Sequence, residues 1–407
     1  MKIYLVTIGS RGDFEPFYAF AKIAASKGHE VHLAVTEEFA PEVKSDGINT
    51  SVLPGTIKQF VDSNGVSIFK NLVDFLPRVR PMIVKILETI SKQILEIRPD
   101  VVLYHPSALT APIAARYLKS LSVLVEIIPI LSPTKEFASA GLWTSDLKFL
   151  NRLTYLGVKV AEKIFYFETK KLAKELNVKK LNHDIAISLV SPAILDRPKD
   201  WPNNSYVVGP WHQTRDEELT QELTDFVKRK ETIYAGFGSM KRGNSQKLAR
   251  TIINTCEKLG LQVIISKGWG GLEVPVEMLN KDFVRFVPGA PHEKLFPKLK
   301  AVIHHGGGGT VHASLRAGTP SIIAPFVVDQ PWWADRLYRA GLGPKALRLR
   351  KFNEKNLKKR IIGIDKYKNE VLQVAEKMRS DQGAENTLNL IIDLIQGRGL
   401  QEIEKKK

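Results

Sequence analysis

In Val302-Ile303-His304-His305-Gly306-Gly307-Gly308-Gly309-Thr310, an apolar strand-like run ends in two histidines, passes through four glycines and enters a helix-like segment. Glycine leaves backbone amides open to a ligand, and amides at the N-terminus of a helix attract anions. We therefore expect these amides, the two imidazoles and the Thr310 hydroxyl to bind a diphosphate. The alternative is a tight strand-to-helix turn in which the histidines are simply buried.

Two common nucleotide-binding motifs do not account for these glycines. A phosphate-loop ATPase would close the loop with Lys-Ser or Lys-Thr, and a dinucleotide site would space its glycines as Gly-x-Gly-x-x-Gly. The chain also has no two Asp residues two positions apart, an arrangement that holds metal-bound phosphates. We expect a site that works without a metal ion or other cofactor.

An acid and an amide follow the next strand-like run. That run covers residues 321–324, and Asp329 and Gln330 come shortly after it. Both side chains should lie at the carboxyl edge of a sheet, where open α/β sheets bind ligands. A carboxylate and a carboxamide together offer the acceptor and the donor that sugar hydroxyls require. Taken alone, an Asp before a helix is more often a cap.

The first strand-like run of the chain ends in a similar polar loop, residues 8–16. Asp13 lies where a carboxylate can accept a proton from a hydroxyl, but an Asp in this position is also a common helix cap. The residues alone leave both interpretations open. In the second half of the chain, Ser239 follows the strand-like residues 232–237 and is expected to reach a phosphate from the matching edge.

Strand-like and helix-like runs alternate through both halves of the chain, which predicts parallel sheets covered by helices on both faces. In the first half the strand-like runs are residues 3–8, 31–35, 101–104 and 123–130. In the second half they are residues 232–237, 263–266, 284–287, 301–304 and 321–324. Prolines gather in residues 191–210, which we interpret as a linker.

The chain has 407 residues, which is enough for two α/β domains that each bury a core. We predict an N-terminal acceptor-binding domain over residues 1–205 and a C-terminal nucleotide-sugar-binding domain over residues 206–385. Residues 386–407 are expected to form a helix that packs back on the N-terminal domain, followed by a charged tail.

The composition is that of a globular protein, with 43% hydrophobic and 25% charged residues. The formal net charge of +17 raises the question of an anionic partner. Because the chain has no zinc-finger spacing, basic heptads or RNA-binding signature, we do not expect nucleic acid. Solvated helix faces are the first interpretation of the many lysines, and contact with an anionic membrane is the second.

Cys256 is the only cysteine, so an intrachain disulfide is excluded and a reducing compartment fits. No uncharged apolar run approaches the roughly 20 residues of a membrane helix. The apolar run at residues 3–8 is too short for a signal peptide. We expect a cytoplasmic protein for which any contact with a membrane is peripheral.

Taken together, these residues resemble the family 1 glycosyltransferases of the GT-B fold, in which two Rossmann-like domains face each other across a cleft. The segment from His305 to Gln330 is similar to the donor signature of that family, in which a histidine binds phosphate and an acid-glutamine pair holds the sugar. The nearest branch contains sterol glucosyltransferases and antibiotic-aglycone glycosyltransferases. This nearer likeness is carried by Gly-Ser-Arg-Gly-Asp (9–13), Pro-Thr-Lys-Glu-Phe (133–137), Asn-Arg-Leu-Thr-Tyr (151–155), Gly-Phe-Gly-Ser-Met (236–240) and Asp-Gln-Pro (329–331).

The resemblance implies an inverting transfer from a UDP-sugar, glucose by default, with Asp13 as the catalytic base. The predicted donor-binding residues are Ser10, Ser239, His304, His305, Gly307, Gly308, Gly309, Thr310, Asp329 and Gln330. Two positions depart from the plant members of the family. Gly289 stands where they have a tryptophan that stacks on uracil, and Ala313 stands where they have a glutamate that binds ribose. UDP is therefore the default nucleotide rather than one that the residues specify.

The acceptor that the resemblance implies is a lipophilic small molecule such as a sterol, a terpenoid or a polyketide. The apolar residues expected to line its pocket, which are also ordinary core residues, are Phe60, Phe75, Phe137 and Trp143. Three alternatives stay open: a glycolipid-synthesising transferase at a membrane surface, a non-catalytic nucleotide-sugar-binding subunit, and a sugar-nucleotide epimerase. The presence of Asp13 together with Asp329 and Gln330 favours an enzyme over a binding subunit.

Overall fold

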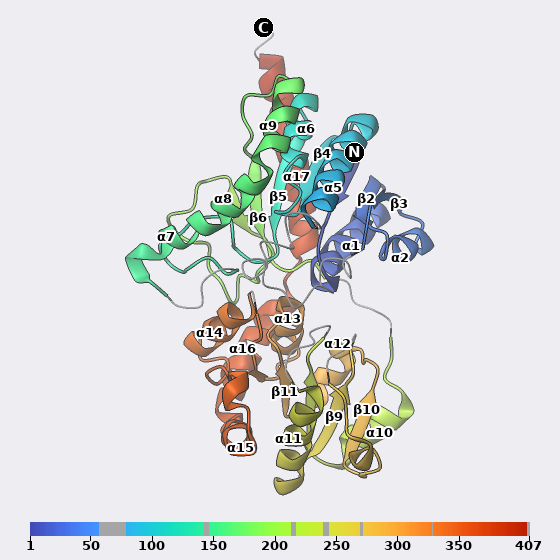
Figure 1. Cartoon of the computed structure of the whole chain (residues 1–407), viewed down its shortest axis with the longest axis vertical. Coiled ribbons are helices and arrows are strands. Elements are labelled where there is room, and N and C mark those ends of the chain that lie inside the picture. Colours follow the sequence, from blue (N-terminus) through green and yellow to red (C-terminus); the bar gives the residue numbers. More distant parts are fainter. Residues whose placement is uncertain are drawn as a thin grey trace. The chain divides into compact units, whose positions relative to one another are not determined.

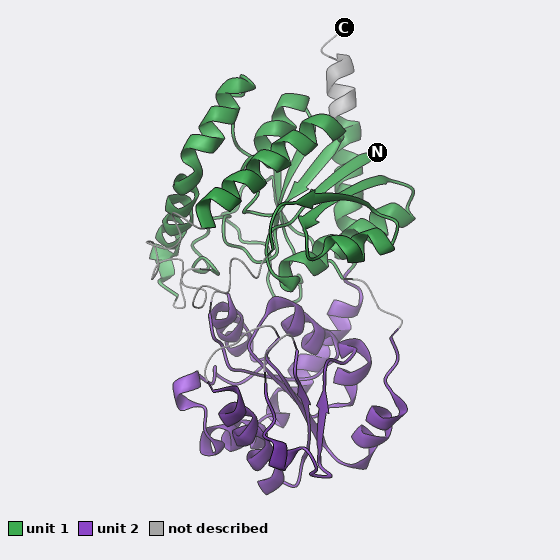
Figure 2. Cartoon of the chain, turned by 45° about the vertical axis from the view of Figure 1, so that its right-hand side comes forward, with its two compact units in different colours: residues 1–142, 146–213, 382–407 green, residues 143–145, 214–381 purple. Residues whose placement is uncertain are grey.

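The computed structural model describes residues 1–56, 79–141, 146–212, 217–238, 244–268, 272–327 and 329–404, with side chains to residue 397. The chain forms two compact units (Figure 2). The first comprises residues 1–142, 146–213 and 382–407, and the second is built from residues 214–381. The structure thus places the boundaries at 213/214 and 381/382, where we predicted 205/206 and 385/386.

The first unit is built on a parallel sheet of seven strands in the order β3-β2-β1-β4-β5-β6-β7 (Figure 1). These strands are β1 (Lys2–Val6), β2 (Glu30–Thr36), β3 (Asn49–Leu53), β4 (Val101–Tyr104), β5 (Leu121–Glu126), β6 (Ile185–Ser188) and β7 (Ser205–Val207). The direction in which successive strands are added reverses between β1 and β4. In a doubly wound sheet, the loops that follow the two strands at such a point diverge and leave room for a ligand.

The predicted linker over residues 191–210 differs from the structure. Residues 205–207, which we assigned to a linker, form β7, and this strand pairs in parallel with β6 through Ser188 and Val207. The strand is three residues long and follows several prolines, so its sequence lacks the apolar run by which the longer strands were found. The rest of the predicted linker therefore also belongs to the first unit.

Helices cover both faces of the first sheet. They are α1 (Arg11–Ser26), α2 (Ala40–Ser45), α5 (Arg80–Ile97), α6 (Ala111–Leu118), α7 (Asn151–Thr154), α8 (Leu156–Glu162), α9 (Tyr166–Glu175) and α17 (Gly383–Glu404). Within the described residues, no helix combines the length and the apolar content needed to cross a membrane.

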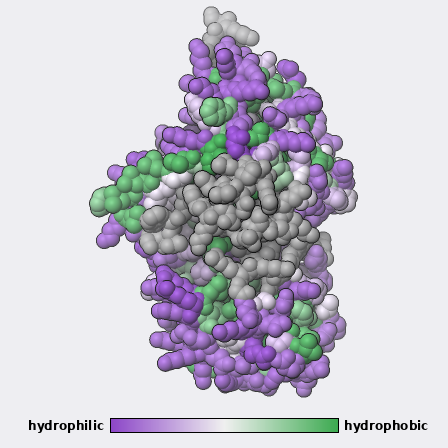
Figure 3. All heavy atoms as spheres, viewed as in Figure 1, coloured by the Kyte–Doolittle hydropathy of each residue, from purple (hydrophilic) through white to green (hydrophobic). Residues whose placement is uncertain are grey.

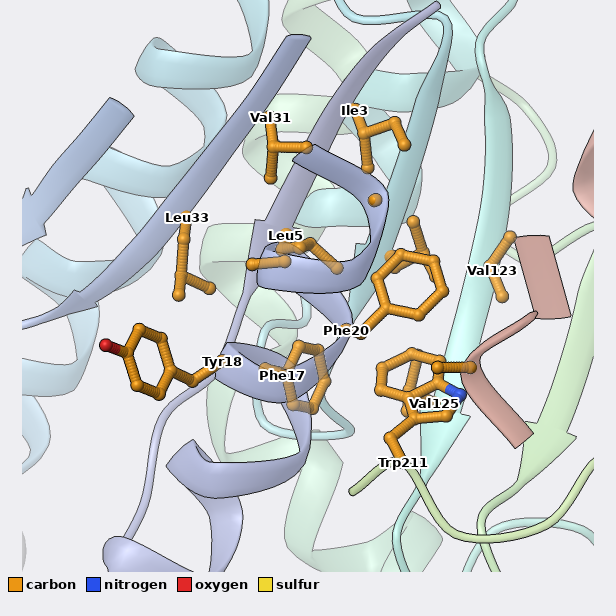
Figure 4. Packing of buried hydrophobic residues seen from close by; sticks show 14 of the residues in the cluster. Ile3, Leu5, Phe17, Tyr18, Phe20, Val31, Leu33, Val123, Val125 and Trp211 are labelled. Atoms are coloured by element: carbon orange, nitrogen blue, oxygen red, sulfur yellow. The ribbon is translucent and has the colours of Figure 1, made fainter. Parts of the chain in front are cut away.

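The C-terminal helix α17 returns to the first unit and packs against α1. Leu388 and Ile391 of α17 belong to the same buried cluster as Phe17 and Phe20 of α1. The indole of Trp211 stacks on Phe20 with a centroid distance of 4.4 Å, and its Nε1 donates to Thr387 Oγ1 at 3.0 Å. Figure 4 shows this indole beside Phe17 and Phe20.

The second unit is built on a parallel sheet of five strands in the order β10-β9-β8-β11-β12. Its strands are β8 (Thr232–Gly236), β9 (Gln262–Ser266), β10 (Val284–Val287), β11 (Ala301–His304) and β12 (Ser321–Ile323). Its helices are α10 (Gln221–Arg229), α11 (Ser245–Lys258), α12 (His292–Leu295), α13 (Gly308–Arg316), α14 (Gln330–Arg339), α15 (Glu354–Ile362) and α16 (Lys368–Arg379). Strand addition reverses between β8 and β11. The predicted fold class, two parallel-sheet α/β domains, is confirmed.

Candidate functional site

The turn between β11 and α13 leaves a row of backbone amides without partners inside the helix. Gly307 occupies the N-cap position of α13, and the first bond to its carbonyl comes from the amide of Val311 at 3.0 Å. The amides of Gly308, Gly309 and Thr310 precede that bond, and the first turn of a helix leaves such groups for a side chain, water or ligand. This row lies at the point where strand addition reverses, so it can receive an anionic group.

The glycines of this turn have different structural roles. Gly306 has a φ of +95°, and a Cβ there would lie 2.7 Å from Ile323 Cγ2, so the backbone and the packing both require glycine. A Cβ on Gly307 would lie 2.7 Å from His305 Nε2. A Cβ on Gly309 would meet nothing within 4 Å. Glycine at position 309 is therefore not needed for packing and keeps the space in front of the amides clear.

His305 lies beside this row with its ring partly buried. The ring packs on Phe326 with a centroid distance of 6.5 Å, and its Nε2 faces Gly307. Burial lowers the pKa of His305 to about 4, so the imidazole is neutral at physiological pH. A neutral imidazole with its proton on Nε2 is a hydrogen-bond donor on the side of the open amides.

His304 takes a different place from the one we expected. Its side chain is completely buried, and its Nδ1 accepts the amide of Gly306 at 3.1 Å. Burial, with smaller effects of His305 and His292, lowers the pKa of His304 well below its usual value. The structure gives this imidazole a role in holding the turn, and its predicted contact with the donor stays a prediction.

Asp329 and Gln330 lie at the start of α14, next to the same edge. The Oε1 of Gln330 accepts the amides of Phe326 and Val327 at 2.7 and 3.1 Å, and the residue is 95% buried (5% exposed). Asp329 occupies the N-cap position but makes no capping bond, and its Oδ2 instead accepts from Trp333 Nε1 at 3.1 Å. The helix-cap alternative for Asp329 therefore does not describe its side chain.

The loops after β8 and β9 approach each other closely next to His305. Gly238 and Gly268 both have positive φ, and a Cβ on Gly268 would lie 2.5 Å from the carbonyl oxygen of Gly238. A Cβ on Gly289 would meet nothing within 4 Å, so space is open where plant members of the resembled family have a tryptophan. Ser239 lies outside the described residues.

In the first unit, Asp13 lies in the first turn of α1 rather than in the loop before it. Its Oδ2 accepts the backbone amide of Ser10 at 2.6 Å and the Ser10 hydroxyl at 3.0 Å. A Cβ on Gly9 would lie 2.2 Å from this oxygen, so the glycine makes room for the carboxylate. Ser10 is the N-cap of α1 and Asp13 is its N3 partner in a capping box, so one carboxylate oxygen serves the capping role that was the alternative to a catalytic one.

The other oxygen of Asp13 faces His105, a residue that the sequence reasoning missed. His105 follows β4, and its Nε2 lies 3.6 Å from Asp13 Oδ1. Its Nδ1 accepts the amide of Ser107 at 3.3 Å, so a neutral ring carries its proton on Nε2, toward the carboxylate. The sequence signal was available: the predicted strand 101–104 ends at His105, as the first strand ends before Asp13.

Of the four predicted acceptor residues, only Phe137 is described. It is 7% exposed, and its carbonyl accepts the hydroxyl of Tyr155 at 3.3 Å. Phe60, Phe75 and Trp143 lie outside the described residues. Among the residues that are described, no group of three or more His, Cys, Asp or Glu side chains could hold a metal ion. Whether the site works without a metal stays a prediction.

Comparison with known proteins finds two domain models that match parts of the chain. Residues 3–135 match the glycosyltransferase family 28 N-terminal domain, and residues 275–394 match the erythromycin biosynthesis protein CIII-like C-terminal domain. The chain is therefore similar to the family 1-like glycosyltransferases of the GT-B fold. Asp13 and His105 lie within the first matched region, and the glycine turn lies within the second.

Relatives and solved structures agree with this similarity. Sterol 3-beta-glucosyltransferase UGT80A2 of Arabidopsis thaliana is 29% identical over 94% of this GT-B chain, which spans 64% of that protein. The glycosyltransferase of kitacinnamycin superposes with a TM-score of 0.74 and 17% identity, covering 96% of this chain and 98% of that one. Glycosyltransferase VinC in complex with dTDP has a TM-score of 0.69 and 14% identity, covering 97% and 100%.

Proposed function

We propose that this chain transfers a sugar from a nucleoside diphosphate sugar to a hydroxyl of a lipophilic alcohol. The observation that carries the proposal is the open amide row of α13 beside Gln330 and Asp329, at one edge of the second sheet. A site that pairs an anion-binding backbone with a carboxylate and a carboxamide suits a molecule that is phosphate at one end and sugar at the other. The complex of the similar structure VinC with dTDP supports a nucleotide as a ligand of this chain.

The leaving diphosphate is stabilised by dipoles rather than by a full positive charge. The amides of Gly308, Gly309 and Thr310 point the positive end of α13 at it, and neutral His305 adds one donor. These groups are fixed by packing before the donor arrives, so little reorganisation accompanies the development of charge. Metal-independent transfer of UDP-glucose is therefore part of the proposal.

Asp13 is the proposed base. Its Oδ2 is held by Ser10, which fixes the carboxylate, while Oδ1 stays directed at His105 and can take the proton of an acceptor hydroxyl. Removal of that proton lets the hydroxyl oxygen attack the anomeric carbon as the bond to the diphosphate breaks. A single displacement of this kind inverts the anomeric configuration. Ser10, predicted to bind the donor, holds the base instead in this proposal.

The proposed acceptor is a sterol-like alcohol. The relative from Arabidopsis thaliana is named as a sterol 3-beta-glucosyltransferase. The match extends over 94% of this chain and 64% of that protein. Because such alcohols reside in bilayers, the proposal includes peripheral contact with an anionic membrane in a cytoplasmic setting, for which the net charge of +17 gives an electrostatic basis.

The test is product analysis with purified protein, UDP-glucose and a 3β-hydroxysterol in detergent, with EDTA present. The proposal expects a steryl β-glucoside and UDP in equal amounts. Conversion of the donor without glycoside would indicate an epimerase, and tight UDP binding without any conversion would indicate a binding subunit. Either result would overturn the proposed transfer.

A further inference from the structure

Residues 148–167 form a helical arm on the surface of the first unit. The arm consists of a 3₁₀ turn (Lys148–Leu150), α7, α8, a second 3₁₀ turn (Lys163–Phe165) and the start of α9. Figure 3, drawn in the view of Figure 1, shows a hydrophobic band along α7 and α8, with hydrophilic residues beside it. We refer to these residues as the outer arm.

The inner face of the outer arm is held by polar contacts. Asn151 is completely buried, and its side chain donates to the carbonyl of Lys135 at 2.9 Å while accepting the amide of Leu147 at 2.8 Å. Thr154 Oγ1 accepts the amide of Ser139 at 2.8 Å. These bonds fix which side of the arm turns inward.

The outward face is apolar, the reverse of what a surface helix normally presents. Its large side chains are Phe149 (77% exposed), Leu153 (57%), Leu156 (53%), Val160 (61%) and Phe167 (77%). Leu153, Leu156 and Val160 of α7 and α8 have the spacing of one face of a helix, and Phe149 and Phe167 extend this apolar surface at the two ends. Nothing in the described structure covers them, so a stripe of aromatic and aliphatic side chains faces outward.

A row of basic residues runs along one flank of this stripe. Its members are Lys148, Arg152, Lys159, Lys163 and Lys170, at spacings of four, seven, four and seven residues. Four of them have no ion pair with a carboxylate among the described residues, and Arg152 lies 3.6 Å from Asp200. From residue 148 to residue 171 the chain has six basic and two acidic residues, so the flank is positively charged.

We infer that the outer arm docks on an anionic lipid bilayer, with the apolar stripe in the interface and the basic row on the lipid headgroups. An exposed helix with aromatic and aliphatic residues on one side and Lys or Arg beside them binds at a membrane surface in this way. A second copy of the chain fits the surface less well, because both copies would bring the same positively charged flank to the contact with few acidic groups to pair with it. The inference adds a docking surface to the proposed function, but its test does not depend on turnover.

The experiment is co-sedimentation of the whole chain with phosphatidylcholine vesicles, with and without phosphatidylserine. The wild type should pellet with the anionic vesicles at low salt, and binding should weaken as salt rises. The triple variant Phe149→Ser, Leu153→Ser, Val160→Ser should bind at least about tenfold more weakly. The matched control, Val276→Ser with Ile362→Ser, removes side chains of the second unit that are 80% and 60% exposed and should bind like the wild type.

A second pair of variants tests the charge. The preference for phosphatidylserine should be abolished in the triple variant Lys148→Glu, Lys159→Glu, Lys163→Glu. The same change in net charge is made by the control variant Lys355→Glu, Lys358→Glu, Lys377→Glu, which should keep most of that preference. All substituted side chains are on the surface, so each variant should melt within a few degrees of the wild type, which circular dichroism can check.

Two outcomes would overturn the inference. Equal pelleting of the arm variants and their controls would mean that the general charge, and not the outer arm, attracts lipid. A concentration-dependent dimer in sedimentation velocity that is lost in the serine variant, without vesicle binding, would assign the stripe to a second copy. Both outcomes leave the proposed transfer intact, because glucosylation of a detergent-dispersed sterol needs no bilayer.

Discussion

The turn after β1 in the first unit and the turn after β11 in the second each follow one of the two strands between which strand addition reverses. They are built by opposite means. The β11 turn presents backbone amides and the neutral imidazole of His305, whereas the β1 turn presents the carboxylate of Asp13, which is held by Ser10 and lies next to His105. Backbone dipoles suit an anion that arrives and leaves, and a fixed carboxylate suits a proton that must be taken up. We therefore expect the β11 turn to bind the diphosphate and the β1 turn to take up the proton, and substitutions can test this division.

Loss of the carboxylate charge at the β1 turn should have the largest effect. Asp13→Asn keeps the size of the side chain but removes the base, so kcat should fall by about 10³-fold. UDP affinity, measured by calorimetry, should stay within a factor of about two, because binding belongs to the other turn. Glu15→Gln removes a charge from the same helix and is the control. Weaker UDP binding in Asp13→Asn would contradict this division.

Acid should weaken the β11 turn. The pKa of His305 is lowered to about 4, so the unfolded chain binds a proton that the folded chain rejects, and stability is lost as pH falls from about 6.5 toward 4. The shift corresponds to about 3 kcal/mol, to which His304 adds in the same direction. Urea unfolding at several pH values should show a flatter dependence in His305→Gln than in the wild type. If the free energy of unfolding depended on pH in the same way in both proteins, the folded chain would protonate His305 as readily as the unfolded chain does.

Filling the space at the open amides should damage binding without damaging the fold. A Cβ at Gly309 would meet nothing within 4 Å, so we expect Gly309→Leu to be accommodated and to melt close to the wild type. UDP affinity should fall on the order of 100-fold, or about 2.7 kcal/mol. Calorimetry with UDP, beside a thermal melt, measures both. Unchanged affinity would place the diphosphate elsewhere.

The glycine three positions earlier should show the reverse behaviour. Gly306→Ala places a Cβ 2.7 Å from Ile323 Cγ2 at a φ of +95°, so the free energy of unfolding should fall by about 2 kcal/mol. At a temperature where the variant is folded, UDP should still bind. Denaturant titration gives the stability. A loss of UDP binding free energy larger than the loss of unfolding free energy would show that Gly306 serves binding as well as the fold.

His105 should have the smallest effect, since it acts through Asp13. His105→Ala should lower kcat about tenfold with KM for the donor unchanged, because only the orientation of the base is disturbed. His105→Gln, which keeps a donor near Asp13 Oδ1, should recover part of the loss. A purely structural role would lower stability in both variants and leave kcat of the folded enzyme unaffected.

Much of the fold could be predicted from the sequence because strands of a parallel sheet are buried on both faces and so read as apolar runs. The bounds of β4, β10 and β11 match the predicted runs, while β5 ends at Glu126 rather than at residue 130. Proline misled the prediction at α1. The predicted loop over residues 8–16 extended to Pro16, but the helix begins at Arg11 and contains that proline.

The glycine turn and the Asp329-Gln330 pair could be found because each lies within a short stretch of sequence. The pair of Asp13 and His105 could not, since 92 positions separate the two residues and only the strand order places β1 beside β4. The burial of His304 could also not be predicted from the sequence. Two successive residues of a strand point to opposite faces, but the sequence does not say which face is open.

The return of α17 to the first unit has a consequence for synthesis of the protein. Residues 214–381 form a contiguous unit and can fold as soon as they leave the ribosome. The first unit begins earlier in the chain, but it lacks Leu388 and Ile391 of its core and the Thr387 partner of Trp211 until α17 has also been translated. The half that carries the proposed base is therefore begun first and completed last, and an incomplete chain exposes the α1 surface that the last helix later covers.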